Sequence, residues 1–375
     1  MSIAEFRLSA ADLAPYGRGL QRPECVWIDR DGVWTSDARG GVCRVHGDRE
    51  PQVLGTGIAD PNGFSRRPDG RFVVAGLSDG RIHEIEPDGR TRVLLESIDG
   101  VPLGTVNYAC ADGPGRIWAS VMTRSLPWMS AMQSRKADGY IIRIDAENAS
   151  AQIVADGLDL TNEVKVSPDG RYLYAVETLG SRVVRFAIRP DGSLGAKETV
   201  GPDSLGPGAL PDGITFDPAG NIWVTMISHN AVHVIDRDGA AHVVYSDANP
   251  AAVQAMARAV ERRTGTLENL LACNEVAGPL RLPTSLAFGG PDGPDGLHRL
   301  GRPHASHHVS GAGGTVADSF NHELVNDASR TASRADRAAG RRPTIAPARP
   351  RSRLQGRARC GPSVKCKAPA AVHRR

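Results

Sequence analysis

One short pattern recurs six times along this chain: two runs of alternating apolar residues joined by a turn that contains a glycine. A glycine after Asp, Ala or Pro suits a turn position that needs a positive φ, and the alternation on both sides predicts a β-hairpin. The turn glycines are Gly32, Gly70, Gly115, Gly170, Gly220 and Gly293. An internal repeat of this kind constrains the fold more than any other feature of the sequence.

Several copies continue with a third strand-like run, and some with a fourth. These further runs are residues 80–86, 139–145, 181–188 and 231–237, followed by 90–96 and 240–246. Three to four short antiparallel strands, repeated every 40 to 70 residues or so, match the blade of a β-propeller. We therefore predict an all-β fold, a six-bladed β-propeller. A sandwich would not repeat one hairpin six times, and a doubly wound α/β fold would need a helix after each strand.

Two segments interrupt the repeats. Residues 249–263 predict a helix with Asn249 as its N-cap and Pro250 at its first position, inserted in the long fifth interval. A loop at 123–139 interrupts the third repeat, and it either forms a lid over an apolar substrate or merely packs down. Its apolar side chains include Trp128, Met129 and Met132.

The position eight residues before each turn glycine carries a side-chain oxygen in every repeat. The six residues are Glu24, Asn62, Asn107, Asn162, Asp212 and Ser285. Equal offsets from the same turn predict equivalent points in every blade, so these side chains should form a ring at one mouth of the central channel. Oxygen donors without thiolate or imidazole favour a hard divalent cation, Ca²⁺ before Mg²⁺ or Mn²⁺, with Zn²⁺ as a further alternative.

A structural role is the alternative for each member of this ring. Asn, Asp and Ser are common where strands begin, because their side chains cap turns and bond the local backbone. Six equivalent positions in register favour the metal-binding ring over six separate caps. Glu163 directly follows Asn162, and strand alternation places it on the opposite face, although near a wide mouth it could reach a substrate.

These motifs resemble those of the SMP-30/gluconolactonase/LRE-like, or regucalcin-like, family over about residues 20–293. The segments that carry the resemblance are PECVW around Glu24, DPNGFSRRPDGR around Asn62, VNYACADGPGRIW around Asn107, LTNEVKVSPDGRYLYAVET around Asn162, LPDGITFDPAGNIWV around Asp212 and PTSLAFGGPDG around Ser285. The resemblance implies a six-bladed propeller with a divalent metal in its channel. It also implies hydrolysis of lactones or, in some relatives, of organophosphates.

The resemblance further implies roles for single residues. Glu24, Asn162 and Asp212 correspond to metal ligands, and Asp212 also corresponds to the general base. Asn107 corresponds to a residue that contacts the substrate or, in some members, the metal. Our further candidates for substrate contact are Asn62, Glu163, Ser285 and Trp128.

The sequence also departs from the family pattern. Many members that act on sugar lactones carry an Arg and an Asp where this chain has Thr105 and Tyr108, which puts a gluconolactone-type sugar in doubt. Cys25 and Cys110 follow ring positions closely, and we interpret them as core thiols rather than nucleophiles.

We predict a metal-dependent hydrolase of a lactone or related cyclic ester. The ion would activate the carbonyl and a water, and Asp212 would take the proton from that water. The alternative is a non-catalytic calcium-binding propeller, a module or scaffold in which the ion only ties the blades together. A strictosidine-synthase-like propeller would leave the metal set unexplained.

The composition changes near residue 294, which divides the chain into a propeller, residues 1–293, and a basic tail, residues 294–375. The tail holds 14 Arg and 6 of the 11 His, but no Trp or Tyr. Such a segment cannot bury enough apolar surface to offset the ordering of its backbone. We therefore expect a disordered tail, or the product of a shifted reading frame, and an incomplete last blade.

Cell location and partners follow from what the sequence lacks. It has no apolar run of 18 residues, and its N-terminus has no basic region followed by an apolar one. Six cysteines without a CxxC pair favour reduced thiols, and a net charge of +3 is too small to imply nucleic acid. We expect a cytoplasmic protein with a small lactone-like substrate and no nucleic-acid or membrane partner; the oligomeric state is not predicted.

Overall fold

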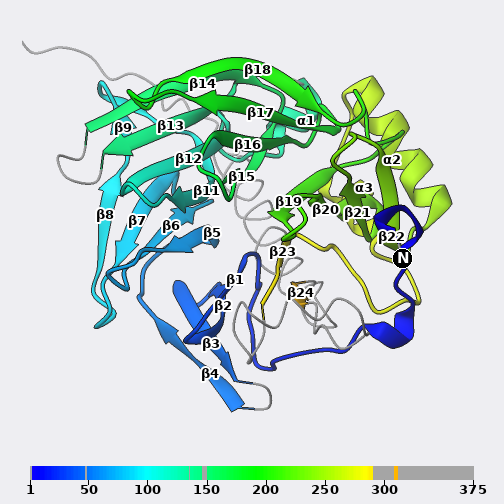
Figure 1. Ribbon diagram of the computed structural model, residues 1–375, viewed down its shortest axis with the longest axis horizontal. Coiled ribbons are helices and arrows are strands. Elements are labelled where there is room, and N and C mark those ends of the chain that lie inside the picture. The colour runs from blue at the N-terminus through cyan, green and yellow to red at the C-terminus, as the bar shows by residue number, and fades with distance from the viewer. Residues whose placement is uncertain (1, 47–48, 135, 146–149, 290–307, 311–375) are drawn as a thin grey trace, which may run out of the picture. The chain divides into compact units, whose positions relative to one another are not determined.

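The computed structural model describes residues 2–46, 49–134, 136–145 and 150–289, together with the backbone of residues 308–310. All of these belong to one compact unit, Met1–Leu324. Within it, five four-stranded antiparallel sheets surround a common centre as the blades of a propeller (Figure 1). Most of the predicted tail, residues 294–375, lies outside the described residues, so its character stays a prediction.

Each blade takes its strands in chain order, with the first strand nearest the centre. Blade 1 contains β1 (Val26–Asp29), β2 (Gly32–Asp37), β3 (Gly41–His46) and β4 (Arg49–Leu54). Blade 2 contains β5 (Pro61–Arg66), β6 (Phe72–Gly76), β7 (Arg81–Ile85) and β8 (Thr91–Leu95). A separate two-stranded sheet follows, made of β9 (Ser97–Ile98) and β10 (Val101–Pro102).

The remaining three blades have the same order of strands. Blade 3 contains β11 (Thr105–Ala111), β12 (Arg116–Thr123), β13 (Gly139–Asp145) and β14 (Ser150–Leu158). Blade 4 contains β15 (Thr161–Val166), β16 (Tyr172–Glu177), β17 (Arg182–Ile188) and β18 (Leu194–Val200). Blade 5 contains β19 (Pro211–Phe216), β20 (Ile222–Met226), β21 (Ala231–Ile235) and β22 (Ala241–Ser246).

The hairpin turns confirm the interpretation of the repeat. Every turn glycine within the described residues has a positive φ, which a residue with a side chain rarely adopts. The φ values are 131° at Gly32, 87° at Gly70, 86° at Gly115, 72° at Gly170 and 88° at Gly220. Gly293 lies outside the described residues.

The prediction of six blades is wrong in number. Among the described residues, the sixth repeat supplies β23 (Ser285–Ala287), which pairs with β24 (His308–Ser310) in a two-stranded sheet and with no third strand. The physical reason is in the sequence, because no alternating apolar run follows Gly293 to build further strands. The sixth repeat still meets the first blade, since the Thr284 hydroxyl donates a hydrogen bond to the Glu24 carbonyl at 2.7 Å.

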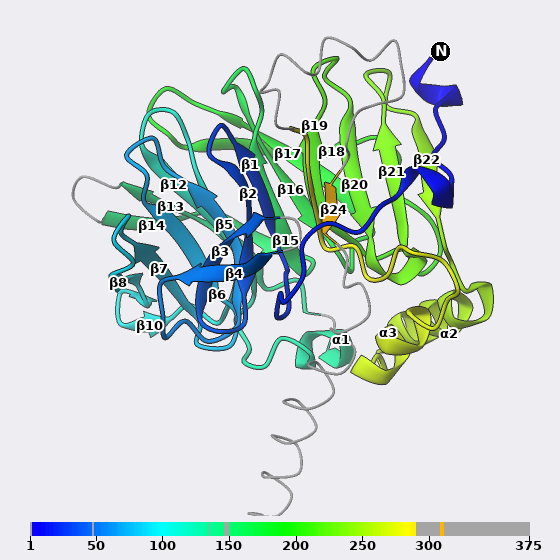
Figure 2. The same cartoon turned by 90° about the horizontal axis from the view of Figure 1, so that it is seen from below.

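Both insertions form helices at the same end of the propeller (Figure 2). The predicted helix is confirmed as α2 (Pro250–Arg262), where the Asn249 side chain accepts a hydrogen bond from the Ala252 N–H at 3.2 Å. The other helical elements are α1 (Ser130–Ser134), α3 (Leu267–Cys273) and the 3-10 turns η1 (Ile3–Glu5), η2 (Ala10–Asp12) and η3 (Ile227–His229). Among the described residues, no helix combines the length and the apolar character needed to cross a membrane.

Aromatic and aliphatic side chains fill the space between neighbouring blades. The Phe72 ring of blade 2 lies 4.9 Å from the Trp34 ring of blade 1, measured between centroids, and 5.8 Å from the Phe64 ring. Rings at these separations add to the stabilisation that burial of their surface gives. Packing of this kind fixes each inner strand relative to the next, and the inner strands carry the predicted ring.

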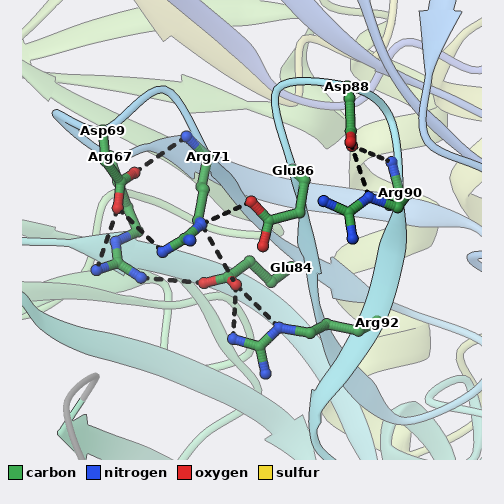
Figure 3. A network of polar contacts seen from close by, with 8 residues as sticks. All are labelled: Arg67, Asp69, Arg71, Glu84, Glu86, Asp88, Arg90 and Arg92. Carbon is green, nitrogen blue, oxygen red and sulfur yellow. Dashed lines mark hydrogen bonds and ion pairs between the residues drawn. The ribbon is translucent and has the colours of Figure 1, made fainter.

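A network of charged side chains covers part of blade 2 (Figure 3). At its centre the Glu84 carboxylate is fully buried and contacts Arg67 Nη1 at 3.0 Å and Arg92 Nη2 at 2.6 Å. Glu86, two residues further along, is partly exposed and pairs with Arg71 at 2.8 Å. A buried carboxylate is tolerated only where cations and hydrogen bonds surround it, and Glu84 meets that condition.

Candidate functional site

One cavity at the centre of the propeller brings most of the predicted residues together. Its lining includes Glu24, Asn62, Asn107, Asn162, Asp212 and Trp128. Its volume of about 80 Å³ is several times the roughly 10–15 Å³ that one water needs on the same measure, so a small organic molecule has room there. Glu163 and Ser285 are buried but are not part of this lining.

The inner strands position these side chains through β-bulges. The pairing between first and second strands is irregular at Asn62 in β5, at Asn107 in β11, at Asn162 in β15 and at Asp212 in β19. A bulge bends the strand and re-aims a side chain, and such bulges are common beside active sites. In blades 2 to 5 the repeat therefore carries a local distortion that turns a polar side chain toward the cavity, whereas Glu24 lies just before the regular strand β1.

In blades 2 and 5 the residue after the bulged position is a glycine, because the space around it is crowded. A Cβ on Gly63 would clash with the Tyr108 ring, and a Cβ on Gly213 would lie 2.5 Å from the Thr284 carbonyl oxygen and 2.7 Å from Ser285 Cα. Glycine at these two positions lets the neighbouring inner strand approach closely. In blade 4 the same position holds Glu163, whose carboxylate is buried and therefore needs hydrogen-bond or charged partners inside the protein.

The ring contains carboxylates that burial disfavours in their charged form. Burial raises the pKa of Glu24, and Asp60 raises it further while Arg22 opposes the shift. Burial also raises the pKa of Asp212 well above its usual range, with added effects from Glu24 and Glu163. A cation held between the two ring carboxylates would reverse this effect, because it stabilises their charged forms.

Two amide oxygens of the ring are buried without a hydrogen-bond partner. They are Asn107 Oδ1 and Asn162 Oδ1. Buried polar atoms normally form hydrogen bonds, so a buried oxygen without a partner indicates a place for a ligand, an ion or a water. In the described part of the chain no group of three or more His, Cys, Asp or Glu side chains is arranged for a metal. The donors that fit a cation are therefore two carboxylates and amide oxygens, a set that suits Ca²⁺.

The side chain of Asn62 forms hydrogen bonds within the protein through both its oxygen and its nitrogen. Its Oδ1 accepts a hydrogen bond from Arg22 Nη2 at 3.1 Å, and its Nδ2 donates to the Asn107 carbonyl at 2.9 Å. Arg22 also lies 3.8 Å from the Glu24 carboxylate. Asn62 thus connects the first, second and third blades at the edge of the cavity, and sequence reasoning missed Arg22 because it belongs to no repeat.

Residues of blade 4 hold the strand that carries Asp212 on both sides. Asn162 Nδ2 donates to Thr178 Oγ1 at 3.1 Å, and Thr178 Oγ1 donates to the Pro211 carbonyl at 2.7 Å. The Glu163 carboxylate accepts from the Ile214 N–H at 3.0 Å. Asp212 therefore sits between two backbone anchors that both originate in blade 4.

Glu163 has three partners beneath the cavity. Besides the Ile214 N–H, it lies 3.8 Å from the Lys165 ammonium and forms a hydrogen bond with Ser285. Burial raises the pKa of Glu163, and the Lys165 charge opposes that shift. This arrangement places Glu163 and Ser285 behind the ring, where they support its backbone.

Cys25 and Cys110 are confirmed as buried thiols without a disulfide. Burial raises the pKa of Cys25 to about 12 and that of Cys110 to about 11. A thiol with so high a pKa is a poor nucleophile near neutral pH.

The upper part of the cavity is apolar. Its walls come from blade ends and from both insertions, and they include Met122, Trp128, Met132, Leu210, Leu267, Leu270 and Leu271. Three of these leucines lie on α3, which our sequence analysis missed. Thr266 and Asn269 form a capping box at its start, and this box with the following leucines was the signal that could have revealed the helix.

Two known lactonases and the solved structure of a gluconolactonase are similar to this chain. A 6-deoxy-6-sulfogluconolactonase from Pseudomonas putida is 27% identical over 274 residues, which are 72% of this chain and 79% of that protein. A pentonolactonase from Haloferax volcanii is 28% identical over 178 residues, which are 47% of this chain and 56% of that protein. The structure of a gluconolactonase from Xanthomonas campestris superposes with a TM-score of 0.50 and 26% identity, covering 62% of this chain and 77% of that one.

The sequence profile of one family matches most of the propeller. It is described as the SMP-30/Gluconolactonase/LRE-like region and matches residues 23–256, which contain five of the six ring positions. Because this match spans more than half of the chain, the protein belongs to the SMP-30/gluconolactonase/LRE-like family.

Proposed function

We propose that this protein is a metal-dependent lactonase, a hydrolase that opens a cyclic ester with water. The observation that carries the proposal is the ring, in which one buried and one partly buried carboxylate face the same cavity as two buried amide oxygens without a hydrogen-bond partner. Two relatives named as lactonases support the choice of substrate class.

Glu24, Asn162 and Asp212 are the residues that would hold the cation. They supply two carboxylates and one unpartnered amide oxygen, and Ca²⁺ is the ion that best suits such donors. A bound divalent ion supplies Lewis acidity, which polarises a lactone carbonyl and lowers the pKa of water.

Asp212 is the proposed general base. Its carboxylate accepts a proton from the attacking water while the water oxygen bonds to the carbonyl carbon. The tetrahedral species then loses its ring C–O bond, and the ring oxygen leaves as an alcohol after it takes a proton. The product is one hydroxy acid, so all atoms of the lactone and the water are accounted for.

Asn107 is the proposed donor to the substrate. Its side-chain amide lines the same cavity, and an N–H of this amide would donate to the carbonyl oxygen as negative charge develops on it. The contacts of Asn62 with Arg22 and with the Asn107 carbonyl hold the backbone of this donor.

Removal of metal is the experiment that tests the proposal. We expect chelation to lower the rate of lactone hydrolysis at least about 100-fold, and Ca²⁺ to restore it, because the ion supplies Lewis acidity. A panel of lactones would be assayed in EDTA and after addition of Ca²⁺, Mg²⁺, Mn²⁺ or Zn²⁺, with spontaneous hydrolysis subtracted. Turnover that survives chelation would contradict metal dependence. A protein that binds Ca²⁺ but opens no lactone would be a binding module instead.

A second prediction concerns the hydrogen bond behind Asp212. Glu163→Ala removes the acceptor of the buried Ile214 N–H, so Asp212 loses an anchor and kcat/KM should fall about 10- to 100-fold. Glu163→Gln keeps an acceptor oxygen at the same place and should stay within a few-fold of the original protein. Lactone kinetics and Ca²⁺ titration of both variants would check this. Equal losses in the two variants would show that the charge of Glu163 matters rather than its hydrogen bond.

A further inference from the structure

The two insertions meet above the cavity and form one apolar roof. Gly265, just before α3, lies so close to Met132 of α1 that a Cβ at Gly265 would be 2.9 Å from Met132 Cε. Side chains of both insertions also share one buried cluster with residues from the ends of blades 3, 4 and 5. The cluster includes Met122, Met132, Leu160, Leu179, Leu210, Ile227, Met256 and Leu270. Segments more than 100 residues apart therefore build a single wall of the site.

The polar lining of the cavity is confined to the ring and its immediate neighbours. In the described residues it consists of Arg22, Glu24, Asn62, Asn107, Asn162, Thr178, Asp212 and Thr284. Arg22 and Asn62 bond to each other, Thr178 bonds to the Pro211 carbonyl, and Thr284 bonds to the Glu24 carbonyl. The groups left for a ligand are the ring carboxylates, the two orphaned amide oxygens and the side-chain N–H of Asn107, all at the floor.

Thr105 and Tyr108, which lie on either side of Asn107 in β11, contribute nothing polar to the cavity. The Thr105 hydroxyl is buried and donates to the Ser125 carbonyl at 2.6 Å. Tyr108 is also buried, and its ring lies against Gly63 with its hydroxyl near Cys25. Neither side chain belongs to the cavity lining.

We propose that the substrate is a lactone whose ring carries a hydrocarbon substituent, with the ester on the polar floor and the substituent under the roof of Trp128, Leu270 and Leu271. This proposal rests on the lactonase function proposed above. Burial of a hydroxyl without a hydrogen-bond partner weakens binding, whereas burial of each methylene strengthens it. A polyhydroxylated lactone would set several hydroxyls against leucine, methionine and tryptophan, so the roof selects against it.

Turnover of matched lactones tests this inference on the unaltered protein. δ-Lactones with alkyl chains from methyl to octyl would be compared with glucono-δ-lactone, which has the same ring. We expect kcat/KM to rise about two- to four-fold for each added methylene until the roof is filled, because burial of a methylene favours binding. A higher kcat/KM for glucono-δ-lactone than for every alkyl lactone would overturn the inference and leave the lactonase proposal intact.

A pair of variants tests whether the roof causes the dependence of kcat/KM on the length of the alkyl chain. Leu271→Asn places an amide in the roof and should lower kcat/KM for the octyl lactone about 10-fold, and less for the methyl lactone. Leu126→Asn makes the same change at an exposed residue outside the cavity lining and should alter neither value. An equal response of the two lactones to Leu271→Asn would contradict a role for this leucine in holding the chain.

Binding of molecules without an ester separates the two proposals. Calorimetry would compare alkyl tetrahydropyrans with anhydroglucitol, which share the ring but cannot be hydrolysed. Tighter binding of the alkyl compounds would support the apolar ligand. If no lactone were turned over as well, that second result would contradict the lactonase function but not the apolar specificity. Equal or weaker binding of the alkyl compounds would overturn the apolar specificity.

Discussion

Replacing Asp212 by Asn is expected to lower kcat/KM for lactone hydrolysis by about 1000-fold, because the amide cannot accept the proton of the attacking water. The substitution keeps the size of the side chain and an oxygen that can contact a cation. Asp212 is buried and faces the cavity beside Glu24, so no solvent-exposed base replaces it. Initial rates with the preferred lactone, measured at saturating Ca²⁺, would give the loss directly.

The control for this variant lies on the same blade. Asp238→Asn removes an exposed carboxylate from the turn between β21 and β22 and should leave the rates unchanged. Ca²⁺ affinity and thermal unfolding would be recorded for both variants, because a misfolded protein would also lose activity. A folded Asp212→Asn protein that binds Ca²⁺ and keeps more than a tenth of the original kcat/KM would remove Asp212 from the role of base.

The repeat made much of the fold predictable. A turn glycine followed by alternating apolar residues defines a hairpin locally, and all five described turns have the backbone conformation that this pattern requires. The polar position upstream of each turn could be found as well, because equal offsets in equal units become equal places in space. Glu24, Asn62, Asn107, Asn162 and Asp212 line one cavity for this reason.

Other features depend on contacts between distant segments, which no local pattern contains. Strand alternation predicted that Glu163 points away from Asn162, and only Asn162 lines the cavity, but the pattern could not show which groups Glu163 meets on the other side. The carboxylate of Glu163 then reaches Ile214 in the next blade, a contact 51 residues away. The predicted number of blades was wrong for a related reason. A hairpin motif predicts a blade only when further strands follow it.

The apolar roof of the cavity shows how the local repeat pattern and the contacts between distant segments combine. Our sequence analysis left open whether Trp128 lines the site, and the structure places it there. The repeat supplies the polar floor of the cavity, whereas the insertions, together with the ends of the blades, supply its apolar walls. We infer that the chemistry resides in the propeller and that the segments added to it contribute to the choice of substrate.

A buried charge on blade 2 gives the largest expected effect on stability. Glu84→Ala should lower the free energy of unfolding by about 3 kcal/mol, because Arg67 and Arg92 lose the carboxylate that both contact. The Arg67 side chain is only 18% exposed, so its charge cannot easily reach water, whereas Arg92 is 56% exposed and can. This difference puts the expected loss at the lower end of the range for a broken buried pair.

Glu86→Ala provides the matched control, since it removes the same side chain two residues away. Glu86 pairs with Arg71 alone, both side chains are partly exposed, and the loss should stay below about 1 kcal/mol. Urea unfolding of the two variants would measure both values, with equal slopes required for a direct comparison. A third variant, Glu84→Gln, keeps the hydrogen-bond acceptor but not the charge and should fall between the other two. If Glu84→Ala and Glu86→Ala lose the same amount, burial adds nothing to the pairing, and the network of Figure 3 is only a set of surface ion pairs.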